Sequence, residues 1–245
     1  MRTQNSIKLI SLNIEMNRHF ERFVPFLKRE QPDVVCLQEV SEFDFPKLKE
    51  VLQMEGRFEP MMRIVKARPE RTLNTGTLGL AFFTRFPAQW FAKYYSGDRS
   101  EIPPEQDDNQ GVRGALFGAT LDVGGMPFTI ATTHFTWTPD GEASAEQRAD
   151  VEALLDVLKE FPDIAFCGDF NAPRGREIWE RIASRYTDTI PREYTSSIDP
   201  VLHRAKGLAY VVDGLFTSPH YRARDVRLVE GVSDHKAIVA HIERA

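Results

Sequence analysis

The chain has 245 residues, of which 31 are Lys or Arg and 36 are Asp or Glu, so its formal net charge is −5. Hydrophobic residues make up 42% and charged residues 27%, values of a soluble globular protein that exclude a disordered or fibrous chain. No apolar run approaches the ~20 residues of a membrane span, and residues 1–6 hold no apolar stretch, so neither a membrane span nor a secretory signal is expected.

The first segments predict a β-α-β unit. Residues 7–13 have the composition of a strand, and residues 18–30 place apolar side chains at the i, i+3, i+4, i+7 spacing of an amphipathic helix. Pro25 leaves the start of that helix open, because proline fits best in a first turn, and Pro32 ends it. Residues 34–38 are nearly all apolar, which is typical of a strand covered on both faces.

The later elements are mostly strands. Gly124-Gly125 predicts a tight hairpin between two of them. Ser144 and Gln147 form a capping box that opens a helix over residues 144–159, and a shorter helix is predicted at 177–184. The predicted strands are residues 78–84, 115–123, 128–134, 164–167, 210–217, 224–229 and 236–242.

This mixture of hairpins and β-α-β units predicts an α/β (α+β) architecture, with two mixed β-sheets packed face to face and helices outside. Two long polar connections, residues 95–114 and 195–208, are expected to be functional or mobile. Similar strands lie on both sides of each connection, so we expect residues 1–245 to form a single domain. Cys36 and Cys167 lie in apolar runs, which predicts buried free thiols and a reducing compartment, the cytoplasm.

Polar residues interrupt the apolar runs near the ends of the predicted strands. Each has a bland interpretation as a turn former, a surface carboxylate or a satisfied polar group. Asp213 is the hardest to explain in that way, because a carboxylate within an apolar run must be paired or desolvated at a cost of several kcal/mol. Together the set predicts a metal-phosphate site, with oxygen ligands for Mg²⁺, imidazoles and amide donors. These residues are Asn13, Glu39, His134, Asp169, Asn171, Asp213, Asp234 and His235.

Two motifs among these residues are specific. Gly168-Asp169-Phe170-Asn171 and Ser233-Asp234-His235, preceded in order by Asn13, Gln38-Glu39 and Thr133-His134, resemble the endonuclease/exonuclease/phosphatase superfamily of deoxyribonuclease I-like metal-dependent phosphoesterases. The resemblance covers nearly the whole chain. It implies a four-layered α/β sandwich with the site at one edge of the two sheets.

The resemblance also implies a cofactor. Glu39 would be the principal ligand of Mg²⁺, or of Mn²⁺ as an alternative, with Asn13 and Asp234 close to the metal or its waters. The metal would neutralise charge on the phosphoryl oxygens and on the leaving group.

The remaining matches imply catalytic roles. Asp169 and Asn171 would orient the nucleophile and hold the phosphate, and His134 would donate to a phosphoryl oxygen. His235, oriented by a carboxylate such as Asp213 or Asp234, would act in acid–base chemistry or hold the phosphate. Asp169 and His235 therefore share the activation of water.

One departure from the family concerns the partner of His134. Family members often carry an acidic residue shortly before the strand at 78–84, where this chain has Thr75-Gly76-Thr77. If that acid orients the histidine, the partner of His134 stays open.

The sequence therefore predicts an Mg²⁺-dependent hydrolase of a phosphodiester, with nucleic acid, a nucleotide-like molecule or a phospholipid head group as substrate. The acidic net charge favours short, single-stranded or small substrates over long duplex DNA. The alternatives are a phosphomonoesterase acting on a sugar or inositol phosphate, a catalytically silent binding domain, and a purely structural role for the polar residues. No obligate protein partner is inferred. Flanking residues that could touch substrate, although each alone is more simply a solvated rim residue, are Arg113, Trp137, Arg174, Arg176, Arg204 and Lys206.

Overall fold

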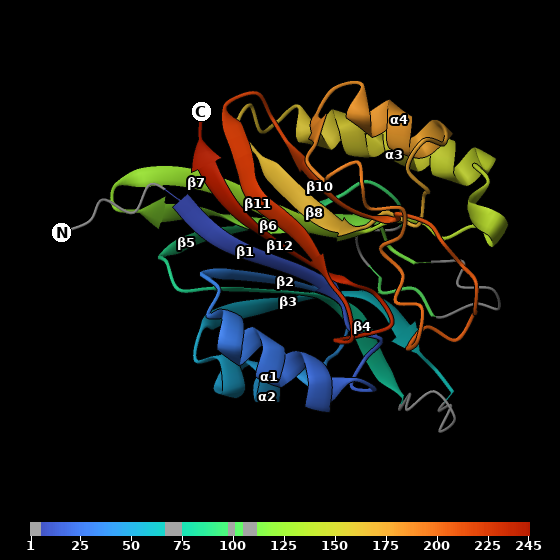
Figure 1. The fold of residues 1–245 in the computed structure, drawn as a ribbon, viewed down its shortest axis with the longest axis horizontal. Helices are drawn as coiled ribbons and strands as arrows, with labels where there is room; N and C mark the ends of the chain where they lie inside the picture. Colours follow the sequence, from blue (N-terminus) through green and yellow to red (C-terminus); the bar gives the residue numbers. More distant parts are fainter. Residues whose placement is uncertain (1–5, 67–74, 98–100, 105–111) are drawn as a thin grey trace.

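Two six-stranded β-sheets pack face to face in this computed structural model, which describes residues 6–66, 75–97, 101–104 and 112–245 (Figure 1). The first sheet has the order β11 (Tyr221–Val229), β12 (Ala237–Arg244), β1 (Ser6–Asn13), β2 (Val34–Ser41), β4 (Gly76–Thr84), β3 (Glu55–Ile64). The second has the order β5 (Ala88–Tyr94), β6 (Ala115–Val123), β7 (Met126–His134), β8 (Ala165–Asp169), β10 (Asp213–Thr217), β9 (Thr187–Asp188).

Helices cover the outer faces of both sheets and complete four layers. Helices α1 (Phe20–Glu30) and α2 (Phe45–Leu52) lie on the first sheet, and α3 (Ala145–Leu158) and α4 (Glu177–Ala183) lie on the second (Figure 1). A 3-10 turn, η3 (Pro139–Gly141), precedes α3. The predicted four-layered α/β sandwich of two mixed sheets is confirmed. None of the helices in the described residues is long and apolar enough to cross a membrane.

The period-2 alternation of β1 shows how the core forms. Ile7 and Leu9 belong to the cluster between the two sheets, whereas Ile10 and Leu12 belong to the cluster beneath α1 and α2. All four are at most 1% exposed. Fully burying such a side chain is worth about 1.5–3 kcal/mol, so a strand covered on both faces is held from both sides.

The predicted strands and helices are present, and the elements that the pattern did not reveal have a common cause. Strands β3, β5 and β9 are edge strands of their sheets, half-exposed or only two residues long, and β3 also contains Pro60. Such strands lose the clear alternation of a central strand. Helix α2 has only eight residues, which is too short for a strong helical period. Helix α1 begins at Phe20, so Pro25 lies inside it rather than in its first turn.

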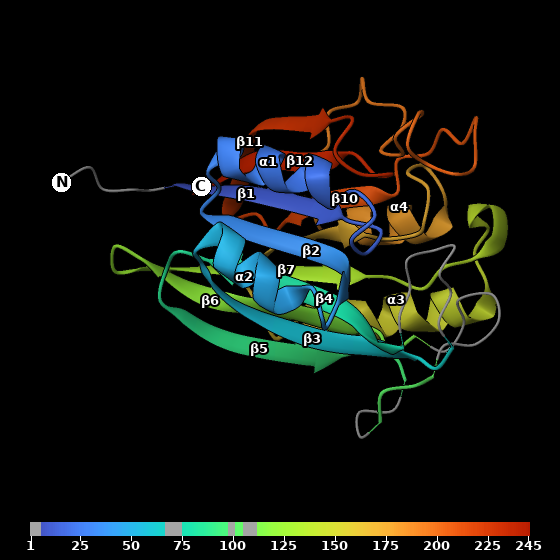
Figure 2. The same ribbon diagram turned by 90° about the horizontal axis from the view of Figure 1, so that it is seen from below.

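The strand directions bring the polar strand ends to one edge. β1 and β2 are parallel, as are β7 and β8, so their carboxyl ends point the same way (Figures 1 and 2). β10 runs antiparallel to β8, and Asp213 pairs with Asp169. Asp213 therefore begins its strand, whereas the sequence placed it within the apolar run of one. β12 runs antiparallel to β1, so the Asp234-His235 segment before it also reaches this edge.

Candidate active site

Asn13 joins the two sheets at this edge. Its Nδ2 donates to Glu39 Oε1 at 3.0 Å and to Asp169 Oδ2 at 3.1 Å, which links β1 and β2 of one sheet to β8 of the other. Its Oδ1 accepts the backbone N–H of Glu15 at 3.2 Å. Asn13 is 1% exposed, so these bonds are shielded from water and fix both carboxylates.

A β-bulge turns Glu39 toward Asn13. The pairing of β2 with β4 shifts between Leu37 and Val40, and Glu39 takes a left-handed backbone with φ of 58°. The preceding residue, Gln38, is fully buried and donates to Thr132 Oγ1 of the other sheet at 2.9 Å. A left-handed conformation costs a non-glycine residue roughly 1–3 kcal/mol, and the bulge aims the carboxylate into the site.

His235 is held between two buried carboxylates. Its Nδ1 donates to Asp213 Oδ2 at 2.8 Å, and its Nε2 lies 3.8 Å from Asp169 Oδ2. Burial opposes the charged imidazole, but Asp213 and Asp169 outweigh it and raise the pKa of His235 well above its usual value. The hydroxyl of Ser197 accepts the backbone N–H of Asp213 at 3.0 Å and so fixes the strand end that carries the orienting acid.

The parallel pairing of β7 with β8 sets His134 beside Asp169. Gly168 makes this approach possible, because at φ of 144° a Cβ there would lie 1.9 Å from the carbonyl oxygen of Thr133. His134 Nε2 then lies 3.6 Å from Asp169 Oδ2 and 4.0 Å from Glu39 Oε1. Within the part of the chain that the structure describes, the carboxylates that approach His134 are those of Asp169 and Glu39. Thr77, in the segment where family members carry an acid, donates its hydroxyl to Glu42 instead.

Asn171 lies in a tight turn after β8. With φ of 50° it donates its backbone N–H to Asp169 Oδ1 at 2.9 Å, and its Nδ2 donates to the carbonyl of Phe135 at 2.8 Å. The turn is the Asx type expected of Asp169, and it also brings the Asn171 side chain to the cavity that Asp169 lines.

Glu15 also belongs to the site, although no sequence pattern pointed to it. Ligand atoms of Glu15, His19 and Asp234 lie within 4.8 Å of one another, and so do those of His203, Asp234 and His235. Glu39 belongs to neither group. Glu15 lies two residues past the end of β1, outside any strand or helix pattern, so only reading beyond the strand end could have found it.

The acids of this edge repel one another. Burial raises the pKa of Asp234, and Glu15 raises it further; burial likewise raises the pKa of Glu39, and Asp234 adds to that shift, although nearby histidines oppose both. A divalent cation would relieve both costs. The carboxylates of Glu39, Asp234 and Glu15 are the hard oxygen donors that Mg²⁺ and Mn²⁺ prefer, so the donor set fits the expected metal. Asn13 borders this position through its bonds to Glu39 and Glu15.

Comparison with known proteins identifies the family. A model described as the endonuclease/exonuclease/phosphatase family matches residues 10–235. The chain belongs to this family. No curated protein matches the chain significantly.

Solved structures of low sequence identity share the family fold. An endonuclease/exonuclease/phosphatase from Beutenbergia cavernae has a TM-score of 0.78 at 15% identity, covering 98% of this chain and 72% of that one. The human Nocturnin catalytic domain with bound sulfate has a TM-score of 0.72 at 21% identity, over 100% and 95% of the two chains. A mannosyl-6-phosphatase from Bacteroides thetaiotaomicron has a TM-score of 0.69 at 13% identity, over 96% and 99%.

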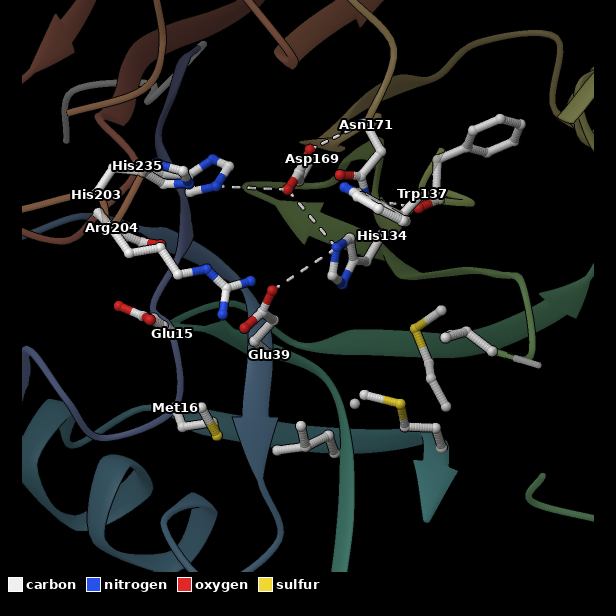
Figure 3. Close-up of a pocket in the computed structure, with 17 residues that line it drawn as sticks. Glu15, Met16, Glu39, His134, Trp137, Asp169, Asn171, His203, Arg204 and His235 are labelled. Carbon is white, nitrogen blue, oxygen red and sulfur yellow. Dashed lines mark hydrogen bonds and ion pairs between the residues drawn. The ribbon is translucent and has the colours of Figure 1, made fainter. Parts of the chain in front are cut away.

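The predicted site residues surround a cavity of about 170 Å³ (Figure 3). Six of the eight predicted residues line it: Glu39, His134, Asp169, Asn171, Asp234 and His235. Asn13 and Asp213 lie behind this lining and bond to its members. The structure thus brings together all eight residues that the sequence singled out.

Two of the six flanking residues also line the cavity, Trp137 and Arg204. The other four flanking residues do not line the cavity and contact other groups of the protein. Arg113 pairs with Glu59, Arg176 pairs with Glu142, Arg174 donates to carbonyls of residues 190, 191 and 194, and Lys206 donates to the carbonyl of Val201.

The long connection at 195–208 carries His203 and Arg204 to the cavity, as expected of a functional loop. Asp199 anchors it: one carboxylate oxygen accepts the N–H groups of Val201 and Leu202 at 2.9 and 2.8 Å, and the other accepts that of Gly231 at 2.7 Å. Burial opposes the charged carboxylate, but these bonds outweigh it and lower the pKa of Asp199. In Figure 3 the Arg204 guanidinium reaches toward Glu39 and Glu15. The connection at 95–114 lies partly outside the described residues.

Proposed function

We propose that this protein is a divalent-cation-dependent phosphoesterase that hydrolyses a phosphodiester, with a nucleic acid, a nucleotide-like molecule or a phospholipid head group as substrate. The observation that carries the proposal is the single cavity shared by Glu39, Asp169, His134 and a carboxylate-oriented His235. An inert scaffold gains nothing from burying these charges, which cost stability.

In this proposal Glu39, Asp234 and Glu15 hold Mg²⁺ or Mn²⁺, and Asn13 keeps Glu39 beside Asp169. When bound, the metal supplies charge neutralisation at the phosphoryl oxygens and the leaving group. His235, protonated because Asp213 and Asp169 favour its cation, presents Nε2–H to a phosphoryl oxygen.

With His235 protonated and the other carboxylates holding the metal or orienting His235, Asp169 is the carboxylate that accepts the proton of the attacking water. Asn13 and the backbone of Asn171 donate to its two oxygens and fix its direction. His134 and the Asn171 amide donate to the remaining phosphoryl oxygens. General acid–base help is typically worth ~10²–10⁴ in rate, and one charge-stabilising donor ~10²–10³.

The test is hydrolysis of bis(p-nitrophenyl) phosphate with Mg²⁺ and with a chelator. We expect chelation, Glu39→Ala and His235→Ala each to abolish turnover while far-UV circular dichroism stays unchanged. Glu55→Ala and His220→Ala, which alter exposed residues outside the cavity, are the controls and should keep turnover. Wild-type-like turnover in Glu39→Ala and His235→Ala would refute the proposal.

A phosphomonoesterase is the second candidate. Arg204 adds a cationic donor and His203 an imidazole beside the metal ligands, and an arginine fork suits a terminal phosphate with two charges. Rates on p-nitrophenyl phosphate and on its bis ester, measured side by side, separate the two. A silent binding domain would show no turnover on either ester and no thermal shift with Mg²⁺.

Both Cys36 and Cys167 are free and buried, which supports the expectation of a reducing, cytoplasmic compartment.

A further inference from the structure

One wall of the active-site cavity carries no polar side chain among the described residues that form it. Met16, Met61, Met62 and Leu78 make up this apolar wall. In Figure 3 Met16 lies on the opposite side of Glu39 from Asp169, and Met61, Met62 and Leu78 line the same cavity. The phosphoryl-binding groups and the apolar wall therefore face the same space from different sides.

Two irregular backbone segments build the apolar wall. The pairing of β3 with β4 shifts between Pro60 and Met62, and this bulge lets the adjacent Met61 and Met62 both line the cavity. β3 lies tightly on Gly79 of β4, where a Cβ would come 2.0 Å from the carbonyl oxygen of Glu59. Glycine at this position lets the two strands lie close together and adds no side chain to the cavity that it lines.

The apolar wall is also tied to the expected metal position. Met16 takes a left-handed backbone with φ of 60°, and its N–H donates to the carbonyl of Glu39 at 3.2 Å. Its side chain packs in one cluster with Ile64 and Leu78. The backbone that positions the wall is therefore bonded to the backbone of Glu39, so a group bound to the wall lies beside the expected metal position.

The chemistry of the wall discriminates between substrates. A sugar or inositol would lose water from its hydroxyls against thioether and methyl groups, at about 1–3 kcal/mol for each unpaired hydroxyl. Methionine sulfur is polarisable and makes favourable contacts with aromatic rings, about 0.3–1.5 kcal/mol each. Trp137, 40% exposed on the loop after His134, adds an indole at the same cavity.

We infer that the apolar wall binds the organic group esterified to the phosphate, and that this group is a planar aromatic ring, such as a nucleobase or an aryl alcohol. This inference rests on the proposed phosphoesterase function. A cavity of about 170 Å³ is smaller than the ~300–1,000 Å³ of sites for drug-sized ligands, so it suits one ring system beside the phosphoryl group better than an acyl chain.

The test measures Kd by calorimetry in the presence of Mg²⁺. Phenylphosphonate is compared with methylphosphonate and cyclohexylphosphonate, and AMP is compared with ribose 5-phosphate and an inositol phosphate. We expect phenylphosphonate to bind about tenfold more tightly than methylphosphonate and more tightly than cyclohexylphosphonate. A matching advantage of AMP over ribose 5-phosphate would assign the ring to a nucleobase, and its absence to a simpler aryl group.

Variants tie the preference to the wall. Met62→Gln keeps the length of the side chain but makes it polar, so we expect it to reduce the phenyl-to-methyl ratio to about twofold while methylphosphonate binds as before. Met126→Gln, a partly buried methionine in the hairpin strand β7 that does not line the cavity, is the matched control and should keep the ratio.

Equal binding of phenyl- and methylphosphonate, no binding of either, tighter binding of cyclohexylphosphonate or of the inositol phosphate, or an unchanged ratio in Met62→Gln would overturn the inference. Loss of the inference and loss of the proposed function are distinguishable. The first leaves turnover of the bis ester intact, whereas the second leaves no turnover whatever the binding preference.

Discussion

Replacing Asp213 by Asn tests the charge arrangement around His235. The carboxylate accepts from Nδ1 of His235 at 2.8 Å, and the two residues are only 3% and 7% exposed, so water cannot take the place of the lost partner. An asparagine can turn its NH₂ toward Nδ1, which moves the ring proton to Nε2 in the neutral imidazole and removes the charge that stabilises the cation.

We expect kcat of Asp213→Asn to fall by ~10²–10³, which is about 2.7–4 kcal/mol in the activation barrier, because His235 would lose the charge with which it stabilises the phosphoryl oxygen. KM should change little, because Glu39, Asn171 and His134 keep their places. The pKa of His235, followed by NMR, should fall, since Asp213 is the strongest of the acids that raise it.

The control is Asp188→Asn. Asp188 is also a buried carboxylate, with its side chain 2% exposed, and it lies in β9, the strand next to β10. It accepts a hydrogen bond from Trp179 Nε1. This variant should lose stability and keep kcat. If Asp213→Asn stays within threefold of the wild-type kcat while folded, the proposed role of the Asp213–His235 pair is wrong.

Three further predictions follow from the same contacts. Gln147→Leu removes the donor to the carbonyl of Thr136 at 2.6 Å, so urea unfolding should show a loss of about 1–3 kcal/mol and kcat should fall more than KM rises; unchanged stability would contradict this contact. Glu30 accepts from Lys8 and Arg227 at 2.8 and 2.7 Å, and although burial opposes it, these cations lower its pKa below 4.5. Its stabilisation, at most about 1 kcal/mol at this partly exposed site, is therefore present above pH 4.5 and lost as the pH falls through the lowered pKa. The difference in unfolding free energy between Glu30→Gln and wild type should therefore be smaller at pH 3 than at pH 7, and an equal difference at both would refute the ion pair. Mg²⁺ should raise the melting temperature of the wild type and not of Asp234→Asn, and an equal rise in both would remove Asp234 from the metal site.

The convergence of the polar strand ends at one edge could be predicted from the sequence, because buried polar residues interrupt apolar runs in a visible way. Asp169 and Asp213 stand at the ends of central strands, and the direction of those strands was enough to bring them together. The capping box was half right. Ser144 accepts the N–H of Gln147 as expected, but the Gln147 side chain donates to the carbonyl of Thr136 in the loop that follows His134, and only tertiary packing decides that direction.

The substrate side of the cavity was not predictable in the same way. Met61 and Met62 lie in an edge strand with a bulge, so neither the period nor the pairing register could be read from the sequence. Glu15 follows its strand in an irregular segment with no pattern at all. Arg204 and Arg176 look alike in the sequence, and only the fold shows that one lines the cavity while the other pairs with Glu142.

The left-handed backbones of Glu39 and Asn171 have a consequence for engineering. Glycine would relax both positions, so a procedure that ranks substitutions by folding energy alone would select it there. The product would be a more stable protein that lacks two side chains of the proposed active site, because the local strain at these positions is the cost of placing a carboxylate and an amide in the cavity.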